Sequence, residues 1–403
     1  MFPEFNAATY FVDLLALSLL LIPAMALITH APTRRTILTL AGAYLLYFIA
    51  PRLVLFYTIF WVLVYLFQRL VSATTDGKFG TPIFWLSMLA MLTPMVVWKL
   101  YFDEFSTLFN LWSNQGLAYI SQTIWTIDLA RAIIIPIGLS FATFRGADLL
   151  VKSWAGKFSA LPLSHILYYA FFPPVQIVGP IIEYEEIEKQ TKPSSDDIYQ
   201  GLMRVAFGLI KVLILAAALQ KSALIFQHYD QAPTLKIWGF LFIYTWFFYL
   251  NFSGYSDLAI GAARAYGFKL KENFAFPYFR PNITEFWNNW HMSLSRFAQR
   301  NVYVPLGGYR KKTQYIAIFA TILAIALWHD LSLGMILFAC YHGAGLIIHR
   351  YYSDRTSKDK KADIVPILWG KILATYLFVV LSFPLLVMPL DKAGQFYLSL
   401  VGL

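Results

Sequence analysis

The sequence predicts an all-α protein, a polytopic bundle of transmembrane helices with about ten to eleven spans. Hydrophobic residues make up 59% of the 403 positions and charged residues only 13%, whereas an average soluble domain is roughly 25% charged. So little charge leaves too little polar surface to cover a water-soluble globule of this size. The composition also excludes a disordered chain and a coiled coil, so we expect most of the protein to lie within a lipid bilayer.

Ten apolar runs support this fold class, because about 20 residues are needed to cross about 30 Å of hydrocarbon. No internal repeat or soluble domain interrupts them, so residues 1–403 are expected to form one membrane-embedded domain. No basic residue precedes the first run, so we expect no cleavable signal peptide. The predicted spans, of which the second and eighth are short, are 8–29, 36–50, 53–71, 81–101, 129–151, 201–228, 236–266, 313–329, 331–350 and 369–388.

A further apolar stretch, 165–182, is expected to be a bent or re-entrant element rather than a regular span. Pro173-Pro174 and Gly179-Pro180 interrupt it, and proline removes a backbone donor and clashes with the preceding helical turn. Irregular backbone at membrane depth is tolerated where protein covers it or water reaches it. We therefore expect this stretch to line a cavity.

Basic residues indicate the orientation of the spans. The net charge is +10, and the positive residues gather between apolar runs, which is typical of cytoplasmic loops and does not indicate nucleic-acid binding. The loops 267–312 and 350–361 are the most basic. These loops lie on one side of the membrane if the N-terminus is outside, so we predict a multi-pass membrane protein with an external N-terminus.

The stretch 283–300 is predicted to be an amphipathic helix at the cytoplasmic boundary. Its apolar residues recur at the spacing of one helical face. A polar stripe runs beside that face and consists of Thr284, Asn288, His291 and Ser295.

His329 is the histidine that most requires a functional explanation. It follows a run of sixteen residues, Thr313 to Trp328, which rises only about 24 Å as a helix and so does not fully cross the membrane. An ionisable side chain below the membrane surface is costly and usually functional. His342 is expected to pack or hydrogen-bond between helices. Besides His291, His329 and His342, the sequence contains His30, His165, His228 and His349.

Other groups within the apolar runs favour structural roles over metal or covalent chemistry. Arg145, Asp257 and Arg264 are expected to form structural ion pairs within the bundle, with Arg145 or a backbone donor as the candidate partner of Asp257. No histidine pair has the spacing of a zinc site, so no metal is expected. The single cysteine, Cys340, excludes a disulfide within the chain and is expected to be a small buried hydrophobe.

Several short motifs together resemble the membrane-bound O-acyltransferase family. They occur in the expected order between about residues 133 and 345. Asp330 replaces the glycine that often follows the family's Trp-His pair. The matching segments are 136–141 (PIGLSF), 171–173 with 179–180 (FFP and GP), 253–257 (SGYSD), 285–295 (EFWNNWHMSLS), 303–308 (YVPLGG) and 327–329 (LWH).

The resemblance implies roles for individual residues. His329 corresponds to the catalytic histidine candidate of the Trp-His pair, and His291 lines the same tunnel from the cytoplasmic side. Within the family, the sequence resembles the bacterial branch, the alginate O-acetyltransferases and teichoic acid D-alanyl transferases, which implies location in a bacterial inner membrane. Further candidates for contacting substrate are Asn288, Trp287, Trp328, Asp257 and Asn251.

The expected function is transfer of an acyl group, with acetyl favoured, across the membrane. A cytoplasmic thioester on coenzyme A or an acyl carrier protein would be the donor, and no bound cofactor is expected. The acceptor would be a hydroxyl of an extracytoplasmic polysaccharide, reached directly or through an accessory periplasmic or extracellular acyltransferase. Transfer of D-alanine or transfer to a lipid are alternatives within the family, and a transporter or channel is an alternative of another class.

The orientation predicts which positions can be labelled from outside the cell. In a Cys340→Ser background, a membrane-impermeant maleimide should label Asn6→Cys on intact cells and should label Lys311→Cys only after permeabilisation. Labelling of Lys311→Cys on intact cells would contradict the orientation.

Overall fold

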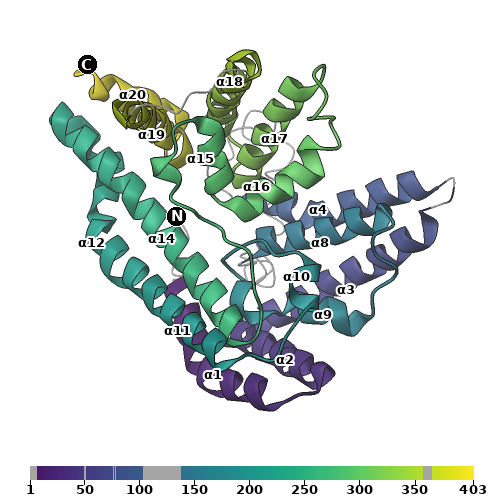
Figure 1. The fold of residues 1–403 in the computed structure, drawn as a ribbon. Helices are drawn as coiled ribbons and strands as arrows, with labels where there is room; N and C mark the ends of the chain where they lie inside the picture. The colour runs from purple at the N-terminus through teal and green to yellow at the C-terminus, as the bar shows by residue number, and fades with distance from the viewer. Residues whose placement is uncertain (1–6, 50, 76, 78, 103–137, 357–364) are drawn as a thin grey trace, which may run out of the picture. The chain divides into compact units, whose positions relative to one another are not determined.

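A computed structural model describes residues 7–49, 51–75, 77, 79–102, 138–356 and 365–403 (Figure 1). This part of the chain contains helices and no strand, which confirms the all-α prediction. Six of its helices are long and apolar enough to cross a membrane. They are Tyr10–Leu27, Pro51–Thr74, Gly80–Val97, Ser195–Gln231, Leu333–Arg355 and Val365–Val387.

The described residues divide into two compact units. The first takes residues from 1–208 together with 255–271, and the second takes 209–254 together with 272–403. The helices of the first unit are α1 (Ala7–Leu27), α2 (Ala31–Ile49), α3 (Pro51–Thr74), α4 (Gly80–Phe102), α8 (Leu139–Trp154), α9 (Leu163–Ala170), α10 (Tyr184–Glu188), α11 (Ser195–Leu209) and the end of α14 (Thr234–Ala265).

The predicted bent element 165–182 is helical only at its start. α9 ends at Ala170, a single 3₁₀ turn follows at Pro173–Val175, and the chain then runs without regular structure to α10. The prolines end the helix as expected. Tyr10 of α1 covers this irregular backbone, because its hydroxyl donates to the carbonyl of Pro173 at 2.6 Å. The stretch is therefore buried by protein, and its re-entrant character stays a prediction.

The second unit contains the hairpin on which His329 lies. α17 (Gln314–His329) ends at that histidine, and after a short turn α18 (Leu333–Thr356) returns beside it. Gly345 of α18 allows the ring of Phe378 to pack closely, because a Cβ at this position would lie 2.7 Å from the ring. The other regular helices of this unit are α12 (Ala217–Leu219), α13 (Ile225–His228), α15 (Ile283–Asn289), α16 (Met292–Ala298), α19 (Val365–Val387) and α20 (Leu390–Leu400).

The predicted spans coincide with helices in the described part of the chain, but the helices do not establish how many times the chain crosses the membrane. α2, α8 and α14 lie over three further predicted spans, and α17 is a shorter apolar helix. The count of ten to eleven therefore stays a prediction. The first part of the predicted span 129–151, through residue 137, and the end of the basic loop 350–361 lie outside the described residues.

The amphipathic segment differs from the prediction. The stretch 283–300 is not one helix but two, α15 and α16, separated at Trp290 and His291. The hydrophobic period continues through this stretch, so the pattern alone did not reveal the break. The polar stripe from Thr284 to Ser295 is consequently not one continuous line.

Arg145, one of the two candidate partners of Asp257, is not the residue that forms its ion pair. Asp257 pairs with Arg204 of α11 at 3.0 Å. Arg145 is fully buried and lies over the ring of Tyr169, with its guanidinium carbon 4.3 Å from the ring centroid. An aromatic face attracts a cation, so contact with this ring replaces a carboxylate partner. Arg264, as expected, joins an ion pair, with Asp197 at 3.5 Å.

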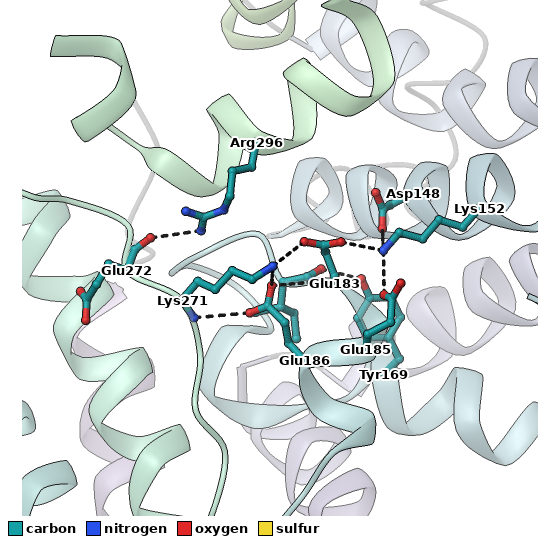
Figure 2. Close-up of polar contacts among 10 residues, drawn as sticks. Asp148, Lys152, Tyr169, Glu183, Glu185, Glu186, Lys271, Glu272 and Arg296 are labelled. Atoms are coloured by element: carbon teal, nitrogen blue, oxygen red, sulfur yellow. Dashed lines mark hydrogen bonds and ion pairs between the residues drawn. The ribbon is translucent and has the colours of Figure 1, made fainter. Parts of the chain in front are cut away.

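A buried lysine organises the polar contacts of the first unit (Figure 2). The ammonium of Lys152 lies 2.8 Å from Asp148, 2.8 Å from Glu183 and 2.7 Å from Glu185. These three carboxylates offer oxygens within 4.8 Å of one another, and Lys152 supplies the positive charge between them. Glu183 also pairs with Lys271 at 2.8 Å, which connects α8 and α10 to the chain after α14.

Removing this buried charge should destabilise the first unit. Lys152→Met would leave neighbouring carboxylates without their shared cation, and breaking a buried ion pair typically costs about 3–5 kcal/mol. We expect a clear fall in the thermal unfolding midpoint in detergent near neutral pH.

Lys271→Met is the matched control, because half of the Lys271 side chain is exposed and exposed pairs contribute about 1 kcal/mol or less. Equal unfolding midpoints for the two variants would show that Lys152 does not hold these elements together.

Candidate functional site

The second unit contains a cavity of about 60 Å³. Its walls are almost entirely aromatic and aliphatic, and the exceptions are three histidines and a serine. The residues that line it are Phe248, Phe252, Tyr278, Phe286, Trp287, Trp290, His291, Leu294, Ile325, His329, Phe338, His342, Val379, Ser382, Phe383 and Leu386. Few polar groups among many apolar ones is the usual composition of a small-molecule site.

Two short helices in the segment before α17 contribute residues to the wall of this cavity. Asn282 caps α15, because its side chain accepts a hydrogen bond from the backbone N–H of Glu285 at 2.9 Å. α15 ends at Asn289, and α16 begins at Met292. The chain turns sharply between them because His291 has φ of 41°, a left-handed conformation that is costly for any residue with a side chain.

Asn273 holds this turn in place. Its carbonyl accepts from the N–H of Met292 at 2.8 Å, and its side-chain oxygen accepts from the N–H and hydroxyl of Ser293 at 3.1 and 2.8 Å. Asn273 is completely buried, so these hydrogen bonds are shielded from water. Each contributes about 1 kcal/mol, enough together to offset the strained backbone of His291, which costs about 1–3 kcal/mol.

The His291 side chain is enclosed by aromatic rings. Its ring centroid lies 4.8 Å from that of Phe252 and 6.3 Å from that of Phe274. Burial, together with the nearby charges of His329 and Arg296, lowers the pKa of His291 to about 3. The imidazole is therefore neutral at physiological pH and is a weak base, which suits a residue that positions a substrate better than one that removes a proton.

His329 has a different environment. It is the last residue of α17 and is exposed, yet it also lines the cavity. Its ring centroid lies 4.4 Å from that of Trp328. His329 can therefore meet both a group inside the cavity and a molecule that arrives from solvent, a position that suits proton transfer during a reaction.

His342 lies in the wall of the same cavity. It is buried on α18, and the indole N–H of Trp287 donates to its Nδ1 at 3.3 Å. A second contact between the same helices joins Thr284 to His349 at 2.8 Å. The expected hydrogen bond between helices is thus present for His342, and it fixes α15 against α18.

The structure separates the residues that the sequence grouped together. His329, His291 and Trp287 line one cavity, and Trp328 contacts the rings of both His291 and His329 without lining it. Asn288 is exposed and is not among the lining residues. Asn251 and Asp257 also lie outside the lining. Asn251 is half-buried on α14, and Asp257 forms its ion pair within the first unit.

Sequence reasoning missed the residues that shape the cavity. Asn273 gave no signal, because its role depends on a turn that is distant in the sequence. Phe252 and Phe274 resembled ordinary apolar residues. His342 could have been found by its position, since it lies on the helix that returns from His329.

The arrangement can support reactions that need one accessible base beside an apolar chamber. The apolar surroundings of the chamber strengthen hydrogen bonds to any charge that develops inside. A histidine at its edge can accept a proton from a hydroxyl group near neutral pH.

Comparison with known proteins gives consistent matches. Residues 149–388 match the family model of membrane-bound O-acyltransferases. A probable alginate O-acetylase AlgI of Pseudomonas fluorescens is 32% identical over 66% of this chain and 54% of its own length. A peptidoglycan O-acetyltransferase of Helicobacter pylori is 31% identical over 65% of this chain and 51% of its own.

A teichoic acid D-alanyltransferase of Bacillus subtilis is 26% identical over 57% of this chain and 62% of its own length. The chain spans about half the length of the first of these curated relatives. The family model covers more than half of the chain, including every cavity-lining residue. The chain therefore belongs to the membrane-bound O-acyltransferase family and is a multi-pass membrane protein.

Proposed function

We propose that this protein transfers a small acyl group, acetyl in the first instance, from a thioester to a hydroxyl of a cell-envelope polysaccharide. The observation that carries the proposal is the cavity of the second unit, where exposed His329 meets an apolar chamber that also contains buried His291. Family membership supplies the reaction class, and the relatives named as O-acetylase and O-acetyltransferase favour acetyl over other acyl groups.

In this proposal His329 acts as the general base. The acceptor hydroxyl loses its proton to His329 as its oxygen attacks the carbonyl carbon of the thioester. The tetrahedral intermediate then collapses, the carbon–sulfur bond breaks, and the departing sulfur receives a proton. The products are an ester and a free thiol, so no acyl-enzyme is required.

The volume of the cavity supports a small acyl group. About 60 Å³ accommodates roughly four to six groups of the size of water, at about 10–15 Å³ each. An acetyl group fits this space, whereas a long acyl chain would need the surrounding aromatic residues to move. A D-alanyl group, transferred by one of the relatives, adds a charged amine for which the described lining offers no carboxylate.

The substrates would approach from opposite sides of an inner membrane, with the N-terminus outside. The donor, coenzyme A or an acyl carrier protein, would come from the cytoplasm, where the basic loops are expected. The acceptor would be a polysaccharide outside the cytoplasm, or an accessory acyltransferase that passes the acyl group on. Lipid acylation would instead appear as labelled lipid in the assay below.

His329→Ala should insert normally and lose transfer. General-base assistance is worth about 10²–10⁴-fold, so kcat should fall by about that factor while the thermal midpoint stays near wild type. The assay follows radiolabelled acetyl from acetyl-coenzyme A, or from an acetylated carrier protein, into polysaccharide and lipid fractions of purified membranes.

His30→Ala is the matched control for His329→Ala, because His30 is exposed and lies in the first unit. Near-normal transfer by His329→Ala would remove the general-base assignment. Uptake of an unmodified solute by wild-type protein, without consumption of thioester, would favour the transporter alternative.

His291→Ala should weaken use of the donor without abolishing the reaction. Loss of one positioning contact of about 1.4 kcal/mol corresponds to about a tenfold rise in KM for the thioester. His291→Gly also removes the ring, but it relieves the left-handed backbone, so it should be the more stable of the two and equally impaired. A KM near wild type in both variants would show that the ring does not contact the donor.

A further inference from the structure

A third histidine of the cavity has a defined protonation state. His342 is 1% exposed and is surrounded by aromatic rings, with its ring centroid 4.4 Å from Phe338 and 5.4 Å from Phe378. The only hydrogen bond that its ring makes within the described part of the chain comes from the indole of Trp287, at 3.3 Å to Nδ1.

This hydrogen bond determines which nitrogen of His342 carries the proton. An indole N–H can only donate, so Nδ1 must offer its lone pair. A neutral imidazole that accepts at Nδ1 carries its hydrogen on Nε2. Protonation of Nδ1 would place two N–H groups against each other, so Trp287 keeps His342 neutral.

The Nε2–H group that results has no partner among the described residues. The Nε2 atom is buried without a hydrogen bond, and His342 lines the same cavity as His329 and His291. A buried donor without an acceptor is unfavourable. Ser382 is another polar residue of the lining, and its hydroxyl donates to the carbonyl of Val379 at 2.7 Å. A molecule in the cavity can supply the acceptor that would satisfy Nε2–H.

We propose that His342 donates its Nε2–H to the carbonyl oxygen of the acyl group, an inference that rests on the acyl transfer proposed above. As the hydroxyl oxygen of the acceptor bonds to the carbonyl carbon, the electron pair of the C=O bond moves to this oxygen. The pair returns when the carbon–sulfur bond breaks and sulfur leaves with its electrons. The proton removed from the hydroxyl passes through His329 to the sulfur.

The two histidines thus have complementary roles that their surroundings set. His329 is exposed and can accept a proton, whereas the lone pair of His342 is occupied by Trp287, so the remaining Nε2–H of His342 can only donate. A donor aimed at developing negative charge stabilises the transition state more than the ground state. His342 should therefore act on kcat and leave KM for the donor nearly unchanged.

The decisive experiment compares His342→Phe and His342→Gln in the acetyl-transfer assay with acetyl-coenzyme A. Loss of one such donor costs about 10²–10³-fold in kcat, so His342→Phe should show that loss with an unchanged thermal midpoint. His342→Gln keeps an N–H donor and should recover part of it. Tyr341→Phe, which removes a hydrogen bond from the same helix to the carbonyl of Phe378, is the control and should keep wild-type kcat.

An infrared measurement separates donation from packing. The ¹³C=O stretch of bound acetyl-coenzyme A should move to higher frequency in His342→Phe, because its hydrogen bond is lost, and should stay near wild type in Tyr341→Phe. If His342→Phe does not fold, Trp287→Phe provides the test. This variant keeps His342 but removes the hydrogen bond that holds its proton on Nε2. It should lower kcat and raise the carbonyl stretching frequency.

Transfer by His342→Phe within threefold of wild type, or an unchanged carbonyl frequency, would overturn the inference while leaving the proposed function standing. Loss confined to KM would also overturn it. Failure of wild-type protein to consume any acyl thioester would instead remove the proposed function, and this inference with it.

Discussion

The turn at His291 is the constraint on which the cavity of the second unit depends. A residue with a side chain adopts a left-handed backbone there, with φ of 41°, and three hydrogen bonds to buried Asn273 hold it. The turn divides the segment into α15 and α16, and Trp287 of α15, His291 of the turn and Leu294 of α16 all line the cavity. The strained residue redirects the chain between the two helices, so one short segment contributes lining residues from both of them.

The cavity gives its three histidines different surroundings within a mostly apolar lining. Enclosure by Phe252 and Phe274 keeps His291 neutral. Exposure leaves His329 able to exchange protons, and the indole of Trp287 fixes the hydrogen of His342 on Nε2. In the proposed mechanism, identical side chains serve as a positioning group, a base and a donor because their surroundings differ, which would let an apolar site perform acid–base chemistry near neutral pH.

The helices could be predicted from the sequence because the length of an apolar run depends only on residues that are close together in the sequence. The apolar runs predicted the helix that ends at His329. The prolines predicted the irregular stretch that follows α9. The break at His291 could not, since the helical period of apolar residues continues through it and the cause, Asn273, acts from outside the segment. The partner of Asp257 could not be predicted for a related reason. Arg204 and Arg145 are equally plausible partners until tertiary packing places one of them beside Asp257.

The most direct measurement of the central claim is an experimental structure of the full chain with a stable analogue of acetyl-coenzyme A, in which a methylene group replaces the thioester sulfur. The account predicts density for the acetyl group inside the cavity, with its carbonyl oxygen within hydrogen-bond distance of His342 Nε2 and its carbonyl carbon facing His329. An acetyl group bound elsewhere, with this cavity filled only by its own side chains, would contradict the account.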